Sequence, residues 1–126
     1  MAALRRALPA LVAVYRFGSS EAGEKRPESD IDLAFMATAP LDPVVRFDLQ
    51  QDLASVLKQE VDLVDLRAAS PVMAMQVIST GRLLYDADPG ARGAFEDLTY
   101  SAYARLNEER RAILQRVAAE GTVYGR

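Results

Sequence analysis

Two aspartates, Asp30 and Asp32, stand two positions apart in a run of strand-forming residues. On a β-strand, residues at this spacing point to the same face, so both carboxylates would share one face while Ile31 and Leu33 point into a core. Two carboxylates this close repel each other unless a cation lies between them. Hard oxygen ligands suit Mg²⁺, which is commonly bound by carboxylates together with substrate phosphates. The pair therefore predicts a magnesium site that acts on a phosphate-bearing substrate.

A small-residue turn, Gly18-Ser19, precedes the aspartate pair and is separated from it by ten residues. Glycine lets the backbone approach a phosphate closely, and a helix N-terminus after the turn would direct free N–H groups at it. Either feature alone is weak evidence, because a Gly-Ser pair is usually only a turn. At this spacing, with an apolar strand-like run before each, the two features together predict a strand, a polar loop and a second strand that bind a triphosphate and its metal.

A third carboxylate, Asp62, lies in the predicted strand 61–66. Burying an unpaired carboxylate is costly, so this residue either faces solvent at a strand edge or joins the aspartate pair in an active site. We favour the second interpretation because of the motif upstream. Alternation puts Asp65 on the opposite face of the strand, where it is expected to support the following turn.

The missing residue types narrow the chemistry further. The chain has no cysteine and no histidine, which excludes thiolate nucleophiles, Ser-His-Asp triads, imidazole bases and cysteine or histidine metal ligands. Catalysis would have to rely on carboxylates, hydroxyls, lysine, arginine and a bound metal. These groups are compatible with phosphoryl or nucleotidyl transfer.

The length and composition indicate one globular domain over residues 1–126. No apolar run approaches the roughly 20 residues needed to span a bilayer, and no signal-peptide core follows the N-terminus, so we expect a cytoplasmic protein without a membrane partner. The net charge of −3 argues against direct nucleic-acid binding through a basic surface.

The remaining elements follow from caps and periodicity. We expect helices that begin after Asp42 and after Ser70, because each is a capping residue followed by proline. The first of these helices should end near Lys58 and the second at Gly81. The other expected elements are a short helix over 2–9, strands over 11–15, 30–36 and 61–66, and a short edge strand over 82–85.

A helical pattern then runs from Asp88-Pro89 to about residue 120 and predicts a long C-terminal helix over 89–120. About 30 residues make a rod of roughly 45 Å, which is longer than a domain of this size needs. Its arginine-rich second half is either a solvated charged face or a surface for a protein partner over 103–124. An apolar stripe at helical spacing is typical of a packed helix and comprises Phe95, Leu98, Ala102, Leu106, Ile113 and Val117.

The Gly18-Ser19 turn, the ten-residue spacer and the Asp30-x-Asp32 pair resemble the signature of the nucleotidyltransferase superfamily related to DNA polymerase beta. The resemblance covers nearly the whole chain and is greatest to the minimal nucleotidyltransferase (MNT) antitoxins. The Arg-Leu-Asn-Glu-Glu-Arg-Arg run at 105–111 is similar to the C-terminal end of MNT proteins that are paired with HEPN-domain toxins.

The resemblance implies an α+β fold with a mixed sheet flanked by helices. It also implies transfer of AMP from ATP to a tyrosine hydroxyl of a HEPN ribonuclease toxin, which silences the toxin. In that case Gly18 and Ser19 would hold the triphosphate, and Asp30 and Asp32 would bind two Mg²⁺ ions. Asp62 would share one metal and act as the general base.

The loop departs from the pattern of many relatives. Many relatives have a basic residue at the position of Ala22, and here an acid, Glu21, precedes that alanine. Lys25 or Arg26 could substitute for the missing basic residue. Two alternatives therefore stay open. One is a small-molecule (antibiotic) nucleotidyltransferase, for which the chain is short. The other is a catalytically inactive antitoxin that acts by binding alone.

Overall fold

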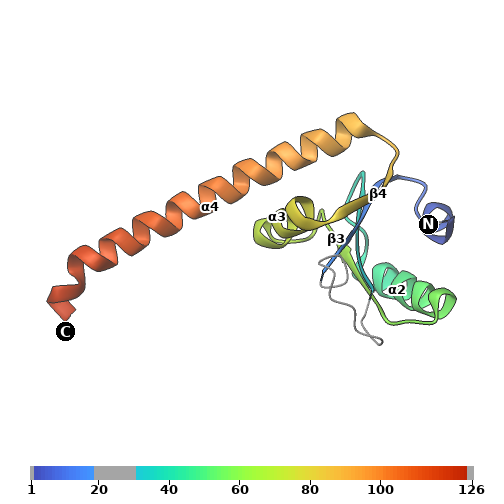
Figure 1. Ribbon diagram of the computed structural model, residues 1–126, viewed down its shortest axis with the longest axis horizontal. Helices are drawn as coiled ribbons and strands as arrows, with labels where there is room; N and C mark the ends of the chain where they lie inside the picture. The colour runs from blue at the N-terminus through green and yellow to red at the C-terminus, as the bar shows by residue number, and fades with distance from the viewer. Residues whose placement is uncertain (1, 19–30, 125–126) are drawn as a thin grey trace.

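The computed structural model describes residues 2–18 and 31–124, which form an α+β fold (Figure 1). The expected order of helices and strands is confirmed, with boundaries within a few residues of those predicted. The elements in chain order are α1 (Ala2–Ala7), β1 (Leu11–Phe17), β2 (Ile31–Ala37), α2 (Pro43–Leu57), β3 (Val61–Asp65), α3 (Pro71–Thr80), β4 (Arg82–Asp86) and α4 (Pro89–Tyr124).

The strands make one mixed sheet in the order β3-β2-β1-β4. β1 is antiparallel to both of its neighbours, β2 and β4, whereas β2 and β3 are parallel. The expected mixed sheet is confirmed, and β4 is an edge strand as predicted. The first and second strands occupy the centre, so the residues at their ends have neighbours on both sides.

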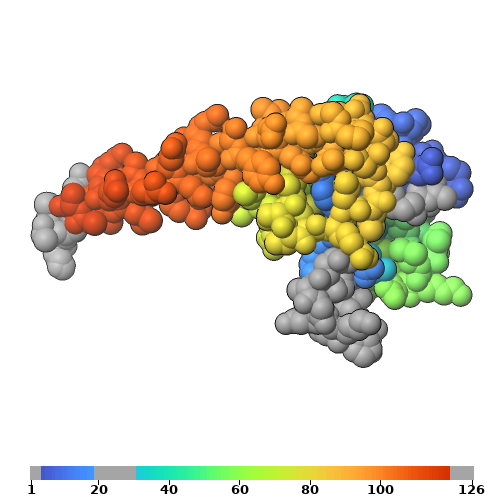
Figure 2. Space-filling view, turned by 45° about the horizontal axis from the view of Figure 1, so that its top comes forward, coloured from blue at the N-terminus to red at the C-terminus, as the bar shows by residue number. Residues whose placement is uncertain are grey.

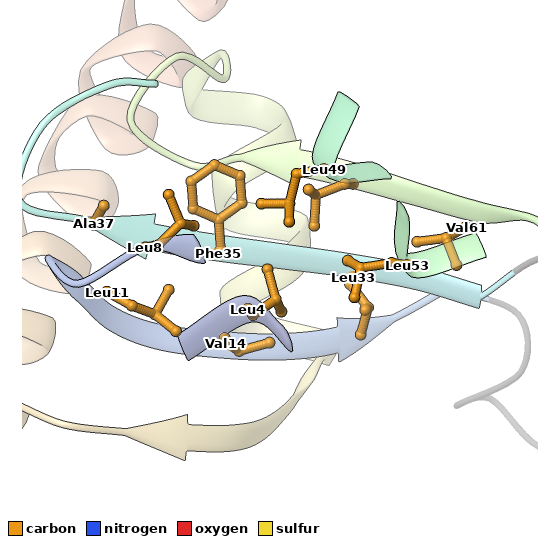
Figure 3. Packing of buried hydrophobic residues seen from close by; sticks show 11 residues of the cluster. Leu4, Leu8, Leu11, Val14, Leu33, Phe35, Ala37, Leu49, Leu53 and Val61 are labelled. Atoms are coloured by element: carbon orange, nitrogen blue, oxygen red, sulfur yellow. The ribbon is translucent and has the colours of Figure 1, made fainter. Parts of the chain in front are cut away.

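One face of the sheet is covered by α1 and α2. Leucines from both helices pack onto alternate residues of β1, β2 and β3, because side chains on a strand alternate between faces. Phe35 and Leu63 are almost fully buried there, and each such side chain stabilises the fold by about 1.5–3 kcal/mol. The residues of this cluster shown in Figure 3 include Leu4, Leu8, Leu11, Val14, Leu33, Phe35, Leu49, Leu53 and Val61.

The other face is covered by α3 and by the first part of α4. Its buried residues are the strand positions that alternate with the first set, together with Ala74 and Val77 of α3. Phe95 of α4 packs against this second cluster. The buried strand residues on this face are Val12, Ala13, Tyr15, Phe17, Ala34 and Met36.

The helices begin where the capping residues predicted. Asp42 Oδ1 accepts a hydrogen bond from the backbone N–H of Val44 at 2.8 Å, and Pro43 opens α2. Ser70 Oγ accepts one from the N–H of Met73 at 3.2 Å at the start of α3. Such caps satisfy N–H groups that have no partner within the helix.

α4 has 36 residues and extends well past the sheet, as the ribbon and the space-filling view both show (Figures 1 and 2). At 1.5 Å per residue its length is about 54 Å. No helix among the described residues is both long enough and apolar enough to cross a membrane.

The apolar stripe of α4 packs against the domain only in part. Leu98 is 68% exposed, Ile113 54% and Val117 59%, whereas Phe95 is covered. For Ile113 and Val117 the cause is geometric, because α3 and the sheet lie under only the first half of the helix (Figure 1). Leu98 lies in that first half, about 100° around the helix from the buried Thr99. On α2 likewise, Leu49 and Leu53 are buried while Val56 is exposed, because only one side of that helix meets the sheet.

Candidate active site

The two described candidate carboxylates lie side by side on neighbouring strands. Asp32 of β2 is the register partner of Asp62 of β3, and the two strands are parallel. Adjacent strands are about 4.8 Å apart, and residues directly opposite each other point to the same face. Sequence alternation within one strand could not establish this pairing. The sheet therefore brings together two carboxylates that are 30 positions apart in the chain.

Gly18 lies at the same end of the sheet, directly after β1. Phe17, the residue before Gly18, is the last residue of β1 and pairs with Asp32 of β2. Gly18 has φ +97°, a conformation that residues with a side chain rarely adopt. A Cβ at this position would also overlap Oδ2 of Asp32 and lie 3.0 Å from its Cγ. Glycine is thus required twice, for the backbone turn and for the space that the Asp32 carboxylate occupies.

The carboxylate pair belongs to the face of the sheet that α3 and α4 cover. Asp32 alternates with Ala34 and Met36, which are buried in the second cluster, and Asp62 alternates with Val64, which packs against it. Asp62 is exposed and Asp32 is partly exposed, so the pair lies where the apolar layer ends. Both groups can therefore meet a substrate that enters from solvent.

The donor set fits Mg²⁺. The carboxylate oxygens of Asp32 and Asp62 share one face and are the hard ligands that this ion prefers, and the backbone turn at Gly18 lies directly beside them. Two of the proposed site residues, Ser19 and Asp30, lie outside the described residues. Within 2–18 and 31–124, no group of three or more acidic, cysteine or histidine side chains forms a metal site.

Asp65 has a structural role on the opposite face, as the alternation predicted. It is only 5% exposed. Its Oδ2 accepts a hydrogen bond from the N–H of Leu41 at 2.7 Å, and its Oδ1 accepts one from the N–H of Arg67 at 3.0 Å. The carboxylate thereby joins the turn after β3 to the segment after β2, and two N–H donors compensate for its burial.

A polar network on the active-site face was not anticipated from the sequence. The Tyr15 hydroxyl donates a hydrogen bond to Glu96 Oε2 at 2.7 Å, and Arg92 Nη1 donates to the same oxygen at 3.1 Å. Arg92 Nε also lies 3.0 Å from Oδ2 of Asp86. This network fastens the start of α4 to β1 and β4. One signal was present in the sequence, because a tyrosine within an apolar strand needs a partner for its hydroxyl.

The network raises the pKa of two of its members, Tyr15 and Arg92. Burial raises the pKa of Tyr15 well above its usual value, and the hydrogen bond to Glu96 adds to the effect. The interaction with Asp86 raises the pKa of Arg92, and Glu96 contributes in the same direction. Tyr15 therefore stays neutral and Arg92 stays charged over the physiological range. The hydrogen bonds that Tyr15 and Arg92 donate to Glu96 therefore do not depend on a change in the charge of either donor over this range.

Comparison with known proteins agrees with this geometry. The family model described as polymerase beta nucleotidyltransferase matches residues 3–90, which include β1, β2 and β3 and the carboxylate pair. The chain belongs to this nucleotidyltransferase family. The match extends over more than half of the chain and ends at the start of α4.

Individual relatives extend the similarity into α4. The chain is 42% identical over 116 residues to the protein adenylyltransferase MntA of Shewanella oneidensis, which covers 92% of this chain and 83% of that protein. A solved toxin–antitoxin complex with AMP-PNP contains a chain that is 41% identical, with a TM-score of 0.83 and coverage of 93% and 94%. A complex of the tri-AMPylated HEPN toxin of Shewanella oneidensis with its MNT antitoxin contains one that is 39% identical, with a TM-score of 0.77 and coverage of 93% and 92%.

These comparisons confirm the resemblance to MNT proteins and the predicted fold. The relatives are a protein adenylyltransferase and the antitoxins of toxin complexes. The roles assigned to Gly18, Ser19, Asp30, Asp32 and Asp62 in this chain stay predictions. The pairing of Asp32 with Asp62 and the close approach of Gly18 to the Asp32 carboxylate are the reasons to test these roles.

Proposed function

We propose that this chain is an antitoxin protein adenylyltransferase. It transfers AMP from ATP to a tyrosine hydroxyl of a cognate HEPN ribonuclease toxin and thereby neutralises the toxin. The observation that carries the proposal is the register pairing of Asp32 with Asp62 beside Gly18, in a chain 42% identical to a protein adenylyltransferase. We also propose that the reaction takes place in the cytoplasm.

The residues divide into a group that holds the nucleotide and a group that supports the transfer. The backbone at Gly18, together with Ser19, holds the triphosphate, because glycine allows close approach to its oxygens. Asp30 and Asp32 would hold the metal ions, and Asp62 would share one of them. Mg²⁺ bound by these carboxylates would neutralise the charge that develops on the transferred phosphoryl group.

The transfer itself is an in-line displacement. The phenolic oxygen of the toxin tyrosine attacks the α-phosphorus of ATP, and a carboxylate oxygen of Asp62 accepts the phenolic proton. The new bond joins the tyrosine oxygen to the α-phosphorus, while the bond to the bridging oxygen breaks and pyrophosphate leaves. Asp62 is exposed, so the hydroxyl of a tyrosine on a protein substrate can reach it. Most of the rate acceleration comes from positioning and charge stabilisation.

The decisive experiment incubates the chain with ATP labelled at the α-phosphate, Mg²⁺ and the product of the neighbouring gene. We expect label on that protein, and we expect Asp62→Asn to lower the single-turnover transfer rate by about 10²- to 10⁴-fold while ATP still binds. Asp52→Asn is the matched control. It is the same chemical change at an exposed position of α2, which covers the opposite face of the sheet.

Three outcomes distinguish the candidate functions. Label on the partner protein supports the proposal. Label on an aminoglycoside, added in a parallel incubation, points instead to an antibiotic nucleotidyltransferase. A stable complex that never becomes labelled means an antitoxin that acts by binding alone. Equal rates for Asp62→Asn and Asp52→Asn would remove Asp62 from the mechanism.

A further inference from the structure

β3 is an edge strand of the sheet, and it carries Asp62, the general base of the proposed transfer. The backbone of an edge strand is paired on one side only, so it shifts or frays more easily than that of a central strand. A general base has to stay within a fraction of an ångström of its working position to remain effective. The outer side of β3 is therefore where additional support for Asp62 is needed.

The pairing of β2 with β3 shows which backbone groups of β3 face outward. Ile31 N–H donates to the carbonyl oxygen of Glu60 at 2.9 Å, and Leu66 N–H donates to that of Phe35 at 3.0 Å. In a parallel ladder, alternate residues direct their backbone groups to the same neighbour, so the even-numbered positions from 60 to 66 bond to β2. Leu63 therefore directs its N–H and its carbonyl away from β2. Leu63 is only 1% exposed, so water has little access to these two groups.

Two side chains of α2 bind both outward groups of Leu63. Gln50 Oε1 accepts a hydrogen bond from Leu63 N–H at 2.8 Å, and Arg46 Nη1 donates one to the Leu63 carbonyl oxygen at 2.8 Å. Arg46 Nη1 also donates to Gln50 Oε1 at 3.2 Å. Both side chains are half-buried and stand one helical turn apart. We call Arg46 and Gln50 the α2 clamp, since they bond to β3 as a further strand would.

The clamp acts on the peptide unit next to Asp62. The N–H that Gln50 binds belongs to the planar peptide bond between Asp62 and Leu63. Holding this plane restrains the α-carbon of Asp62, from which the carboxylate projects. The Leu63 side chain packs in the cluster under α2, whereas Asp62 points to the opposite face. The clamp therefore reaches the proposed base through the backbone alone.

We propose that Gln50 and Arg46 are positioning residues for Asp62, because the α2 clamp holds β3 so that the Asp62 carboxylate stays beside Asp32 during transfer. This inference rests on the proposed function and deepens it by naming side chains that support the reaction without touching the substrate. The apolar side chains of α2 cannot take this role, since they have no group that hydrogen-bonds to a backbone. Both partners of Gln50 Oε1 are donors, so position 50 requires an acceptor.

Two neighbouring glutamines provide a matched pair of variants. Gln50→Met removes the acceptor but keeps the length of the side chain, and Gln51→Met makes the same change at an exposed position of α2. At saturating ATP we expect Gln50→Met to lower the single-turnover rate of AMP transfer by about 10- to 100-fold, with ATP affinity within about twofold of the wild type. Gln51→Met should keep both wild-type values. The rates are measured well below the melting temperature of each variant, so that a loss of stability alone does not change them.

The conservative variant tests the chemical requirement at position 50. Gln50→Glu keeps an acceptor oxygen for Leu63 N–H and for Arg46, so it should transfer AMP within about threefold of the wild-type rate. If Gln50→Met does not fold, Arg46→Met takes its place, because it leaves the bond between Gln50 and Leu63 intact. We expect Arg46→Met to slow transfer by about 3- to 10-fold. Transfer by Gln50→Glu as slow as by Gln50→Met would contradict the need for an acceptor.

A double-mutant cycle determines whether the clamp acts through Asp62. In the Asp62→Asn background the base is already lost, so adding Gln50→Met should change the residual transfer rate by less than about twofold. The decrease in melting temperature caused by Gln50→Met should be the same in both backgrounds, because Leu63 N–H loses its partner in each. An equal loss of rate in the two backgrounds would overturn the inference, since a purely structural role does not depend on Asp62.

Amide hydrogen exchange gives a measurement that is independent of activity. Leu63 N–H lies on the outer side of an edge strand, yet its bond to Gln50 should make it exchange slowly in the chain without ATP. We expect its exchange to become at least about tenfold faster in Gln50→Met and to stay unchanged in Gln51→Met. Equal exchange of Leu63 N–H in these variants would show that the clamp does not hold β3 and would overturn the inference.

The results also separate this inference from the proposed function. If the wild-type chain labels the product of the neighbouring gene, and Gln50→Met transfers AMP as fast as Gln51→Met, the positioning role is overturned and the enzyme assignment stands. If the wild-type chain transfers no AMP, both proposals fail. Slower transfer by Gln50→Met with unchanged ATP affinity, together with faster exchange at Leu63, supports both.

Discussion

The two faces of the sheet differ in what they bury. The face under α1 and α2 is filled by leucine, valine and phenylalanine side chains that interdigitate between two helices and three strands. The face under α3 and α4 has an apolar layer too, but it also carries the Tyr15–Glu96–Arg92 network and, where the layer ends, Asp32 and Asp62. The same strands supply both faces, since alternate residues point in opposite directions.

The difference separates stability from chemistry. Apolar burial on the first face holds the strands in register, and that register sets Asp32 opposite Asp62 on the second face. Changes to the first face should therefore affect folding, and changes to the carboxylate pair should affect transfer. Variants that affect only one of these two properties test the division.

The largest effect is expected at the carboxylate pair. Asp32→Asn keeps the shape of the side chain but removes its charge, and the loss of a metal clamp worth about 4 kcal/mol would slow transfer roughly 10³-fold. Single-turnover labelling of the toxin measures the rate. The expected melting temperature is close to that of the wild type. A variant that unfolds, or one that transfers at the wild-type rate, would contradict the division between the two faces.

A core residue of the first face should give the reverse result. Leu49→Ala leaves a cavity between α2 and the sheet and should lower the free energy of unfolding by about 3 kcal/mol, while the folded fraction transfers AMP normally. Urea denaturation measures the loss. Val56→Ala on the same helix is the control, because an exposed valine should change stability by no more than about 0.5 kcal/mol. Equal losses in the two variants would mean that α2 is not held by its buried side.

The smallest effect is expected at the link between β1 and α4. Tyr15→Phe removes the hydrogen bond to Glu96 and should cost about 1 kcal/mol at neutral pH. Burial raises the pKa of Tyr15 in the folded state, so the unfolded chain releases this proton first, near pH 10. The stability that Tyr15 contributes is therefore complete below about pH 10 and is lost as the pH rises through the folded value.

Chemical denaturation at a series of pH values tests this sign. The difference between wild type and Tyr15→Phe should shrink above about pH 10, because phenylalanine has no proton to lose. Tyr100→Phe, at an exposed position of α4, should show neither the loss at neutral pH nor the convergence. A difference that grows with pH would show that the neutral hydroxyl is not what stabilises the link.

Much of the fold could be predicted from local features of the sequence. Asp42 and Ser70 cap helices because their side chains accept hydrogen bonds from nearby backbone N–H groups, which depends only on residues a few positions away. Alternation predicted that Asp65 faces away from the active site, since strand geometry has a period of two residues. The aspartate spacing and the Gly-Ser turn are local features as well, and they indicated the reaction class.

Only the tertiary structure decided which distant residues meet. The parallel pairing of β2 with β3 set Asp32 beside Asp62, and the turn after β1 put the backbone of Gly18 against the Asp32 carboxylate. No local pattern contains strand register. The exposure of Ile113 and Val117 likewise depends on where α3 and the sheet end beneath α4, because the helical period fixes which residues share a face but not whether anything covers that face.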